Sequence, residues 1–412
     1  MYEWNNGYQY IMQIRQDYIE RYGSLDIYNL KTMCEKLKPK YDNFLGCVDI
    51  VNYGTWNLVK YSLIKGGEID IYENHDSIYR ELRALTVDMK TCDIVLCPFR
   101  KFFNVNEIDE TQADVVVERI KNAKDVEITN KMDGSMIAAR YYNEKVIMSG
   151  TGSLDTEKAP ILCDAYTYVT DNITEMLKAY PDYTFCFEFI SVKYPIVVIY
   201  KEEQQGLYLI GMRNVKTGEQ MPYHIVAEVA NKYNVAMTQI EERTFDEITN
   251  ARKDYASKDK EGWVIFVDGV LYKMKCEDYL AVHKIISKAA SVNAIIHAIA
   301  DNCFDDMMAY VPKAYHNRIM RVAKIVIDYN NTERKKIDDY YNQYKDIEDR
   351  KAFAQAINAI PKQYRGYMFA LKNGQEYSVL KSANGRYVRW KEITGDDVSS
   401  WIKEFAKMVE KD

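Results

Sequence analysis

Short runs that alternate apolar and polar residues fill the middle of the chain, between about residues 126 and 275. This period of two is typical of strands that bury one face of a sheet. Two segments with a helical period, 161–180 and 223–234, interrupt these runs. The runs are 125–142, 145–150, 183–190, 195–200, 206–214, 262–267 and 270–275. We therefore predict an α+β domain built on antiparallel sheets.

The hydrophobic period changes to that of a helix after about residue 278 and stays helical through the segments 279–302, 313–331 and 333–358. The first 50 residues are also helical in pattern, whereas residues 56–105 indicate short strands. A chain of 412 residues is long enough for two domains. We expect an antiparallel-sheet domain over residues 1–280, followed by a mostly α-helical domain over residues 281–412.

The composition restricts the class of protein. No run of about 18 apolar residues and no charged leader before an apolar block is present, so we expect a cytoplasmic protein without a membrane span. The eight cysteines form no CxxC pair, which favours reduced thiols over disulfides or a zinc site. A net charge of −6 argues against binding nucleic acid by bulk charge, so phosphate contacts must come from a local basic groove.

The peptide Lys131-Met-Asp-Gly-Ser lies between two strand-like runs. A lysine in this place stands at a strand end facing a pocket, and the glycine allows a close backbone approach. K-x-D-G alone is short enough to arise by chance, in which case Lys131 is an exposed turn residue. The charged residues that follow in order favour a functional site: Glu188, Glu261, Lys273 and Lys275.

This set of residues suits nucleotidyl transfer from ATP. Attack on the α-phosphorus requires a deprotonated amine, and lysine is the side chain whose pKa falls most readily among other cations. Lys273 and Lys275 are separated by one residue on a strand, so both face the same side. We expect them to lower the pKa of Lys131 and to neutralise the α-phosphate.

Carboxylates complete the predicted site. Glu188 and Glu261 can hold Mg²⁺, which takes few protein carboxylates and keeps several waters. Taken alone, each glutamate is as readily explained as a surface ion pair. Asp133, two residues beyond the nucleophile, is placed to meet the ribose or its bound water.

These motifs resemble those of the covalent nucleotidyltransferase superfamily, and most closely the phage RNA ligase 1 family of tRNA-repair ligases, over about residues 56–306. The upstream segments ELRALTVDM and RKFFNVNE add to the resemblance, and KFFN is the most family-specific peptide. The resemblance implies that Lys131 carries AMP on a nucleotidyltransferase (ATP-grasp-like ligase) domain. It further implies nucleotide contacts for Tyr61, Arg83, Lys101, Asp133, Glu188, Lys273 and Lys275, metal contacts for Glu188, Glu261 and Asp305, and a ligation role for Tyr279.

Simpler interpretations remain open for some of these residues. Arg83 and Lys101 could form a solvated basic patch, and Tyr279 could be a packing residue at the domain junction. The family also has a lysine in a K-G-S-like turn where this chain has Thr151. Phosphate binding there is therefore weaker or falls to another residue, for which Arg140 is the candidate.

The implied activity is that of an ATP-dependent RNA ligase. It would join RNA 3′-OH and 5′-phosphate ends through a lysyl-AMP enzyme and an adenylylated RNA, with Mg²⁺, in tRNA repair. Nicked tRNA is the expected partner, and the host cytoplasm the expected location if the chain is phage-encoded. The C-terminal domain would recognise structured RNA, helped by the cations and rings of residues 381–391.

Three alternatives stay open. A DNA ligase or a capping-type guanylyltransferase shares the nucleophile motif, but both normally carry an appended OB-fold, and the helical pattern after residue 278 argues against one here. A catalytically silent RNA-binding relative is the third, and Thr151 gives it some weight.

Overall fold

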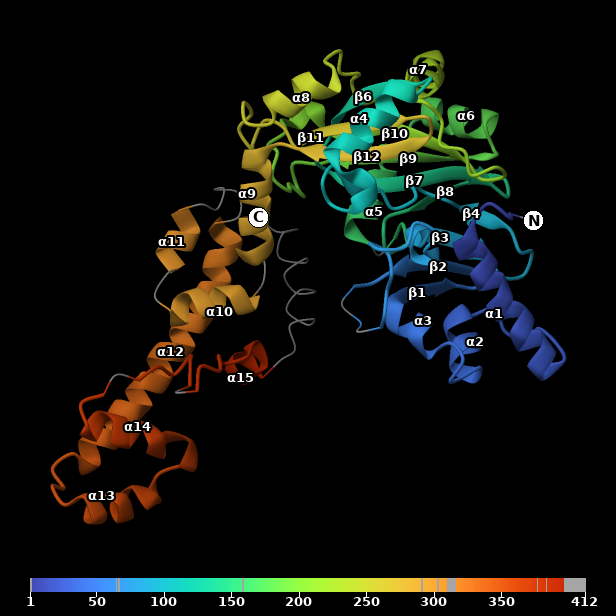
Figure 1. The fold of residues 1–412 in the computed structure, drawn as a ribbon. Helices are drawn as coiled ribbons and strands as arrows, with labels where there is room; N and C mark the ends of the chain where they lie inside the picture. Colours follow the sequence, from blue (N-terminus) through green and yellow to red (C-terminus); the bar gives the residue numbers. More distant parts are fainter. Residues whose placement is uncertain are drawn as a thin grey trace. The chain divides into compact units, whose positions relative to one another are not determined.

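The computed structural model describes residues 2–395 other than 64, 66, 158, 290–291, 302–303, 310–315, 376 and 383. The chain divides into two compact units, Met1–Leu280 and Ala281–Asp412 (Figure 1). The first unit holds three four-stranded sheets, and the described part of the second is helical. The predicted α+β arrangement with a helical C-terminal region is therefore confirmed.

The first sheet is preceded in the chain by three helices that share its apolar core. Its strands are antiparallel and adjacent in chain order: β1 (Val48–Tyr53), β2 (Trp56–Tyr61), β3 (Arg83–Asp88) and β4 (Ile94–Leu96). The helices are α1 (Asn6–Tyr22), α2 (Leu30–Lys36) and α3 (Asp42–Cys47). Asn5 caps α1 by accepting from the Tyr8 backbone N–H, and Gly23 ends it in the left-handed conformation. The buried face of α1 packs into the same core as this sheet.

The other two sheets of the first unit come from the alternating middle of the chain. One has the order β10-β9-β7-β8 and the other β5-β12-β11-β6. All their neighbouring strands are antiparallel except the pair β12 and β5. The bounds are β5 (Phe103–Asn104), β6 (Val126–Lys131), β7 (Ser135–Tyr142), β8 (Lys145–Ser149), β9 (Tyr183–Ile190), β10 (Gly206–Asn214), β11 (Gly262–Val267) and β12 (Val270–Lys275).

Helices cover one face of the β10-β9-β7-β8 sheet. They are α5 (Pro160–Tyr166), α6 (Asp171–Ala179) and α7 (Tyr223–Lys232), and their apolar residues share one core with those strands. Helices α4 (Ala113–Asn122) and α8 (Phe245–Ala251) belong to the same unit. Side chains on the opposite face of this sheet are thus left to form the site.

One predicted strand is absent. The apolar run 195–200 has no strand structure. The backbone N–H groups of Val197 and Val198 donate to Asp133 Oδ2, each at 2.8 Å. A carboxylate therefore satisfies amides that the period-two pattern assigned to a neighbouring strand.

The second unit is built along one long helix. Its elements are α10 (Val292–Ala300), α11 (Phe304–Ala309), α12 (His316–Tyr344), α13 (Arg350–Ala356), α14 (Lys362–Lys372) and α15 (Trp390–Thr394), and α9 (Glu277–Ala289) spans the boundary between the units. One apolar cluster joins α10 and α12 to Leu380 and Trp390, and a second joins α12 to α13 and α14. Among the described residues, no helix is long and apolar enough to cross a bilayer.

Candidate functional site

The end of β6 places Lys131 against a buried carboxylate. Lys131 and Lys275 both pair with Gly262 of the central strand β11, one from each side. Glu261 directly precedes Gly262 and so lies between the two ammonium groups. Glu261 Oε2 is 2.9 Å from Lys131 Nζ, and Glu261 Oε1 is 2.9 Å from Lys275 Nζ. One carboxylate thus holds two lysines in place.

Gly262 makes this close approach possible. Its φ is +150°, and a Cβ at this position would lie 2.0 Å from the Met274 carbonyl oxygen. A side chain would therefore push β11 away from β12 and separate Glu261 from Lys275. Gly134, three residues after Lys131, is constrained in the same way, since its Cβ would lie 2.4 Å from the Phe189 carbonyl oxygen.

The electrostatics of the lysines differ from the sequence-based expectation. Burial alone would lower the pKa of Lys131, but Glu261 and Glu188 outweigh it, and the pKa is raised. Lys273 is the lysine whose pKa is lowered, to about 7, because of burial and the nearby charges of Lys101 and Arg83. The expected lowering of the Lys131 pKa was wrong, because the period-two pattern does not reveal the carboxylate beside the amine.

A pocket of about 240 Å³ opens beside Lys131 between the two central sheets. On β12, Tyr272 and Met274 are buried, so Lys273 and Lys275 face the pocket together, as their spacing predicts. Arg83 also lines it. Glu188 is the one carboxylate among its described lining residues, and the others are apolar or uncharged: Phe99, Phe102, Thr129, Asn130, Met132, Gly134, Met136, Ile210, Thr238, Val264 and Leu271.

Three predicted nucleotide contacts, Tyr61, Lys101 and Asp133, are not among the described lining residues of this pocket. Lys101 stands over the ring of Phe103 at 4.5 Å and is 4.0 Å from Glu107. Tyr61 packs against the core of the first sheet. Burial raises the pKa of its hydroxyl, and the charge of Arg83 lowers it by less. The sequence analysis did not single out Phe102, whose ring makes two cation–π contacts. Lys273 Nζ lies 5.1 Å from the ring centroid, and the Arg83 guanidinium carbon lies 5.7 Å from it.

Asp133 joins the loop after Lys131 to two other segments by hydrogen bonds. Besides the amides of Val197 and Val198, its carboxylate accepts a hydrogen bond from the Tyr279 hydroxyl at 2.7 Å. Its backbone N–H donates to the Tyr200 hydroxyl at 3.0 Å. Tyr279 is 1% exposed and therefore both packs and hydrogen-bonds. A ribose contact by Asp133 stays a prediction, since protein donors already surround this carboxylate.

Two carboxylates meet near Lys131. Phe185, Phe187 and Phe189 pack under the helices, so Glu188 points to the opposite face of β9. It accepts from the Gly134 N–H at 2.8 Å. Burial, opposed by Lys131 and reinforced by Glu261, raises the pKa of Glu188 to about 7.

Few possible metal ligands lie around Lys131. Within the described residues, no three or more His, Cys, Asp or Glu side chains gather as a metal site. Glu188 and Glu261 fit Mg²⁺ nevertheless, because this ion takes few protein carboxylates together with phosphates and water. Asp305 is exposed on α11 of the second unit, and its metal contact stays a prediction.

Arg140 does not take the place of the lysine that the family has where this chain has Thr151. It is buried, and its guanidinium donates to the carbonyls of Ile94 at 2.6 Å, Val95 at 3.3 Å and Pro181 at 2.6 Å. Its role is to hold β4 beside β7, so the phosphate contact considered for it was wrong. Thr151 is exposed in its turn. Lys60 of β2 lies beside this turn, with Nζ 3.5 Å from where a Cβ on Gly152 would be.

Rings and cations of residues 381–391, which were expected to clamp RNA, contact other residues of the second unit. Trp390 is 2% exposed in an apolar cluster. Tyr387 stacks on His297 with ring centroids 3.8 Å apart. Lys381 forms an ion pair with Asp301 at 2.7 Å, and Arg386 pairs with Glu392. These rings and cations thus support the fold of the second unit, and Trp390 cannot stack on a base.

The comparisons with known proteins point to one family. A family model described as RNA ligase matches residues 81–280, which confirms the RNA ligase resemblance over that segment. The "Putative bifunctional polynucleotide kinase/RNA ligase" of Autographa californica nuclear polyhedrosis virus is 21% identical over 74% of this chain, which spans only 42% of that protein. The "Putative RNA ligase" of Thermovibrio ammonificans is 25% identical over 71% of this chain and 77% of its own.

Two solved RNA ligase structures show a low level of similarity to this chain. An archaeal ATP-dependent RNA ligase is 12% identical, with a TM-score of 0.42 over 83% of this chain and 96% of the other. A Naegleria gruberi RNA ligase with PPi is 16% identical, with a TM-score of 0.36 over 45% of this chain and 57% of the other.

Proposed function

We propose that this chain, whose residues 81–280 match the RNA ligase family, is an ATP-dependent RNA ligase that joins 3′-OH and 5′-phosphate ends. In the proposed reaction, the Lys131 amine attacks the α-phosphorus of ATP and pyrophosphate leaves. AMP then passes from lysine to the RNA 5′-phosphate, and the 3′-OH displaces it. The main support is the arrangement of Lys131, Glu261 and Lys275 at one edge of a pocket lined by further cations.

Lys131 can attack only after losing a proton. Its ion pair with Glu261 favours the ammonium form, so the reaction requires this pair to loosen. Lys275 holds the other oxygen of Glu261. The carboxylate can therefore turn toward Lys275 and release Lys131 while keeping one counter-charge.

The pocket suits a nucleoside triphosphate. Its apolar lining, which includes Met136, Ile210 and Val264, offers a dry surface for a base. Arg83 and Lys273 supply positive charge for the phosphates. Burial and then the neighbouring cations lower the pKa of Lys273, and a bound anion would offset the repulsion between these positive charges.

Glu188 and Glu261 are the proposed ligands of Mg²⁺. Bound there, the ion would neutralise charge on the α-phosphate and the leaving pyrophosphate. The protein contributes the orientation of both carboxylates: the Gly134 amide fixes Glu188, and the two lysines fix Glu261. Asp305 is proposed as a further, metal-linked residue.

The proposed substrate is nicked tRNA in the cytoplasm, that of the host if the chain is phage-encoded. We assign adenylylation to residues 1–280 and recognition of the structured RNA to residues 281–412. The family resemblance supports this division, and the buried Trp390 limits recognition by the second unit to surfaces other than the expected clamp.

Incubation with α-labelled ATP tests the proposal directly. Wild-type protein should form a covalent AMP adduct, and Lys131→Ala should form none while remaining folded. Lys121→Ala, an exposed lysine of α4, serves as the control and should label normally. Loss of labelling in both variants, or an adduct on Lys131→Ala, would reject the nucleophile assignment.

A panel of ends then assigns the substrate. Sealing of 5′-phosphate RNA but not of DNA is expected, together with partial sealing of pre-adenylylated RNA by Lys131→Ala. A preference for nicked DNA, or transfer of GMP to a 5′-diphosphate end, would instead identify a DNA ligase or a capping-type enzyme. No adduct from any nucleotide would indicate a catalytically silent RNA-binding relative.

A further inference from the structure

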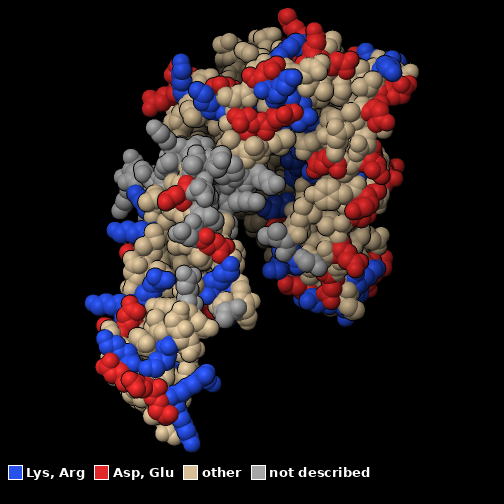
Figure 2. Space-filling model, turned by 60° about the vertical axis from the view of Figure 1, so that its left-hand side comes forward, with Lys and Arg blue, Asp and Glu red and all other residues tan. Residues whose placement is uncertain are grey.

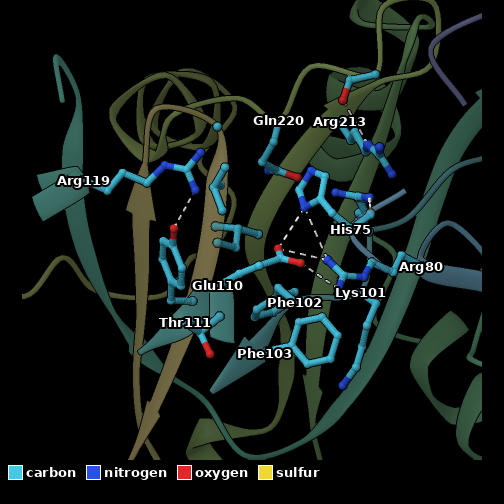
Figure 3. Close-up of a pocket in the computed structure, with 16 residues that line it drawn as sticks. His75, Arg80, Lys101, Phe102, Phe103, Glu110, Thr111, Arg119, Arg213 and Gln220 are labelled. Atoms are coloured by element: carbon cyan, nitrogen blue, oxygen red, sulfur yellow. Dashed lines mark hydrogen bonds and ion pairs between the residues drawn. The ribbon is translucent and has the colours of Figure 1, made fainter. Parts of the chain in front are cut away.

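A second cavity, of about 200 Å³, opens next to the nucleotide pocket, and Phe102 and Leu271 line both. Its lining gathers residues that are far apart in the sequence, from the segment before β3 to the hairpin of β11 and β12 (Figure 3). Five of its lining side chains are cationic: Arg80, Arg100, Lys101, Arg119 and Arg213. Glu110 is the one carboxylate among the described lining residues. We call this cavity the arginine cleft.

Two of the arginines are neutralised and form its fixed wall. Arg80 makes a two-pronged contact with Glu110, at 3.1 and 2.9 Å. Arg213 makes a similar contact with Glu81, at 2.9 and 3.1 Å. Both guanidiniums are buried, so these paired contacts hold the wall rigid.

Arg119 is different. Its guanidinium donates to the Tyr272 hydroxyl at 2.8 Å, and none of the ion pairs recorded between described residues includes it. Arg119 is exposed on α4 and lies on the other side of the cleft from Arg80 and Lys101 in Figure 3. A permanent charge thus faces the cavity without a counter-charge in the described part of the chain.

Arg100 and Lys101 add to the imbalance. Arg100 lies 3.4 Å from Glu81, a carboxylate that already serves Arg213. Burial lowers the pKa of Arg100, and Arg80 and Arg213 lower it further while Glu81 opposes them. Lys101 is 4.0 Å from Glu107, and burial together with Arg83 and Arg80 lowers its pKa. The cleft therefore holds more positive than negative charge.

This concentration of charge is local. The chain has a net charge of −6, and basic and acidic side chains are mixed over the face drawn in Figure 2. A narrow cavity with cationic walls focuses its field on an anion of matching size. Guanidinium groups match the geometry of phosphate oxygens, and the cavity has room for a phosphate group with some water.

We propose that the arginine cleft binds a phosphate group, with Arg119 and Arg100 as its main ligands. Two sources share this chemistry: a backbone phosphate of an RNA strand whose end lies in the neighbouring pocket, and free pyrophosphate. The RNA source rests on the proposed function, whereas binding of pyrophosphate can be measured without any catalysis.

The test compares Arg119→Gln with Lys121→Gln in the full chain. Glutamine removes the charge of Arg119 but keeps a donor for Tyr272, and Lys121 is a cation of the same helix outside the cleft. Affinity for a 5′-phosphorylated RNA oligonucleotide is measured by fluorescence anisotropy at several salt concentrations. Arg119→Gln should weaken binding roughly tenfold, the loss expected for one charged hydrogen bond. The slope of log affinity against log salt should fall by about 0.7 relative to Lys121→Gln.

Pyrophosphate binding is measured on the same proteins by titration calorimetry. If only pyrophosphate affinity drops in Arg119→Gln, free pyrophosphate is the source and the phosphate site stands. Arg119→Lys, which restores the charge, should recover the salt slope in RNA binding. Unchanged affinity for both ligands, or an equal loss in Lys121→Gln, would overturn the proposal. Failure of the wild-type protein to form an AMP adduct would count against the proposed function alone, since neither binding measurement depends on it.

Discussion

The ammonium of Lys131 lies 2.9 Å from Glu261, in a carboxylate contact shared with a second lysine. Glu261 is 3% exposed, and the side chains of Lys131 and Lys275 are 20% and 17% exposed. A charged group that is mostly buried needs a counter-charge beside it, so replacing one of these three residues should destabilise the charged form of the others.

Glu261→Gln should therefore destabilise the protein and abolish the AMP adduct. Two mostly buried ammonium groups would lose their counter-charge, at a cost of about 3 kcal/mol in the free energy of unfolding. Urea denaturation measures this cost. The control is Glu118→Gln, an exposed carboxylate paired with Lys121, whose change should stay within about 0.5 kcal/mol. Equal stability of the two variants would mean that Glu261 is compensated by other groups.

Lys273 should make nucleotide binding depend on pH. Its pKa of about 7 means that it is charged below and neutral above that pH in the free protein. Affinity for an ATP analogue with a methylene bridge between the α- and β-phosphates should fall as pH rises from 6 to 8.5, by at most about tenfold per unit above the pKa. Lys273→Arg stays charged and controls for titration of the nucleotide. Parallel pH profiles for the two proteins would show that Lys273 is not the titrating group.

Parts of this site could be predicted because they depend on local periods. A period of two predicts the shared face of Lys273 and Lys275, and both line the pocket beside Lys131. The same pattern failed at residues 195–200, since alternation cannot show that Asp133 takes the amides of Val197 and Val198. Nor could alternation show that the Arg140 guanidinium donates its hydrogen bonds to three backbone carbonyls.

The remaining features depend on contacts between distant segments. Arg119 and Tyr272 are 153 residues apart, and Arg80 and Glu110 are 30 apart. A single sequence shows these residues only as scattered charges. The arginine cleft therefore becomes visible only after the strands have brought its walls together.

Asp133→Asn should loosen the segment around residues 197–198. The N–H groups of Val197 and Val198 both donate to Asp133 Oδ2, and an amide oxygen in its place carries no charge, so both hydrogen bonds would weaken. Hydrogen exchange measured by mass spectrometry should speed up there. Tyr279→Phe is the matched variant: it removes the third hydrogen bond, costs about 1 kcal/mol, and leaves exchange at these amides unchanged. Faster exchange in both variants would show that Tyr279, too, holds the segment.

Ending the chain after residue 288 should separate adenylylation from RNA choice. The residues from Arg83 to Tyr279 lie before the cut, within the unit Met1–Leu280. The shortened protein should form the AMP adduct but lose its preference for nicked tRNA over an unstructured oligonucleotide. Asp305→Ala in the full chain controls for the lost carboxylate. An undiminished tRNA preference in the shortened protein would contradict the role proposed for residues 281–412.

The ion pair between Glu81 and Arg213 has a consequence for where this protein can be divided. The match to the family model begins at residue 81, yet Asn5, which caps α1, also donates to Glu81 at 3.3 Å. The Trp4 ring lies 4.9 Å from the Arg213 guanidinium. The N-terminal 80 residues thus belong to the same compact unit as the matched segment and share an apolar core with it. We therefore expect that a fragment beginning at residue 81 would keep the family similarity but would not fold independently, because it would lose the part of this core that the first 80 residues supply.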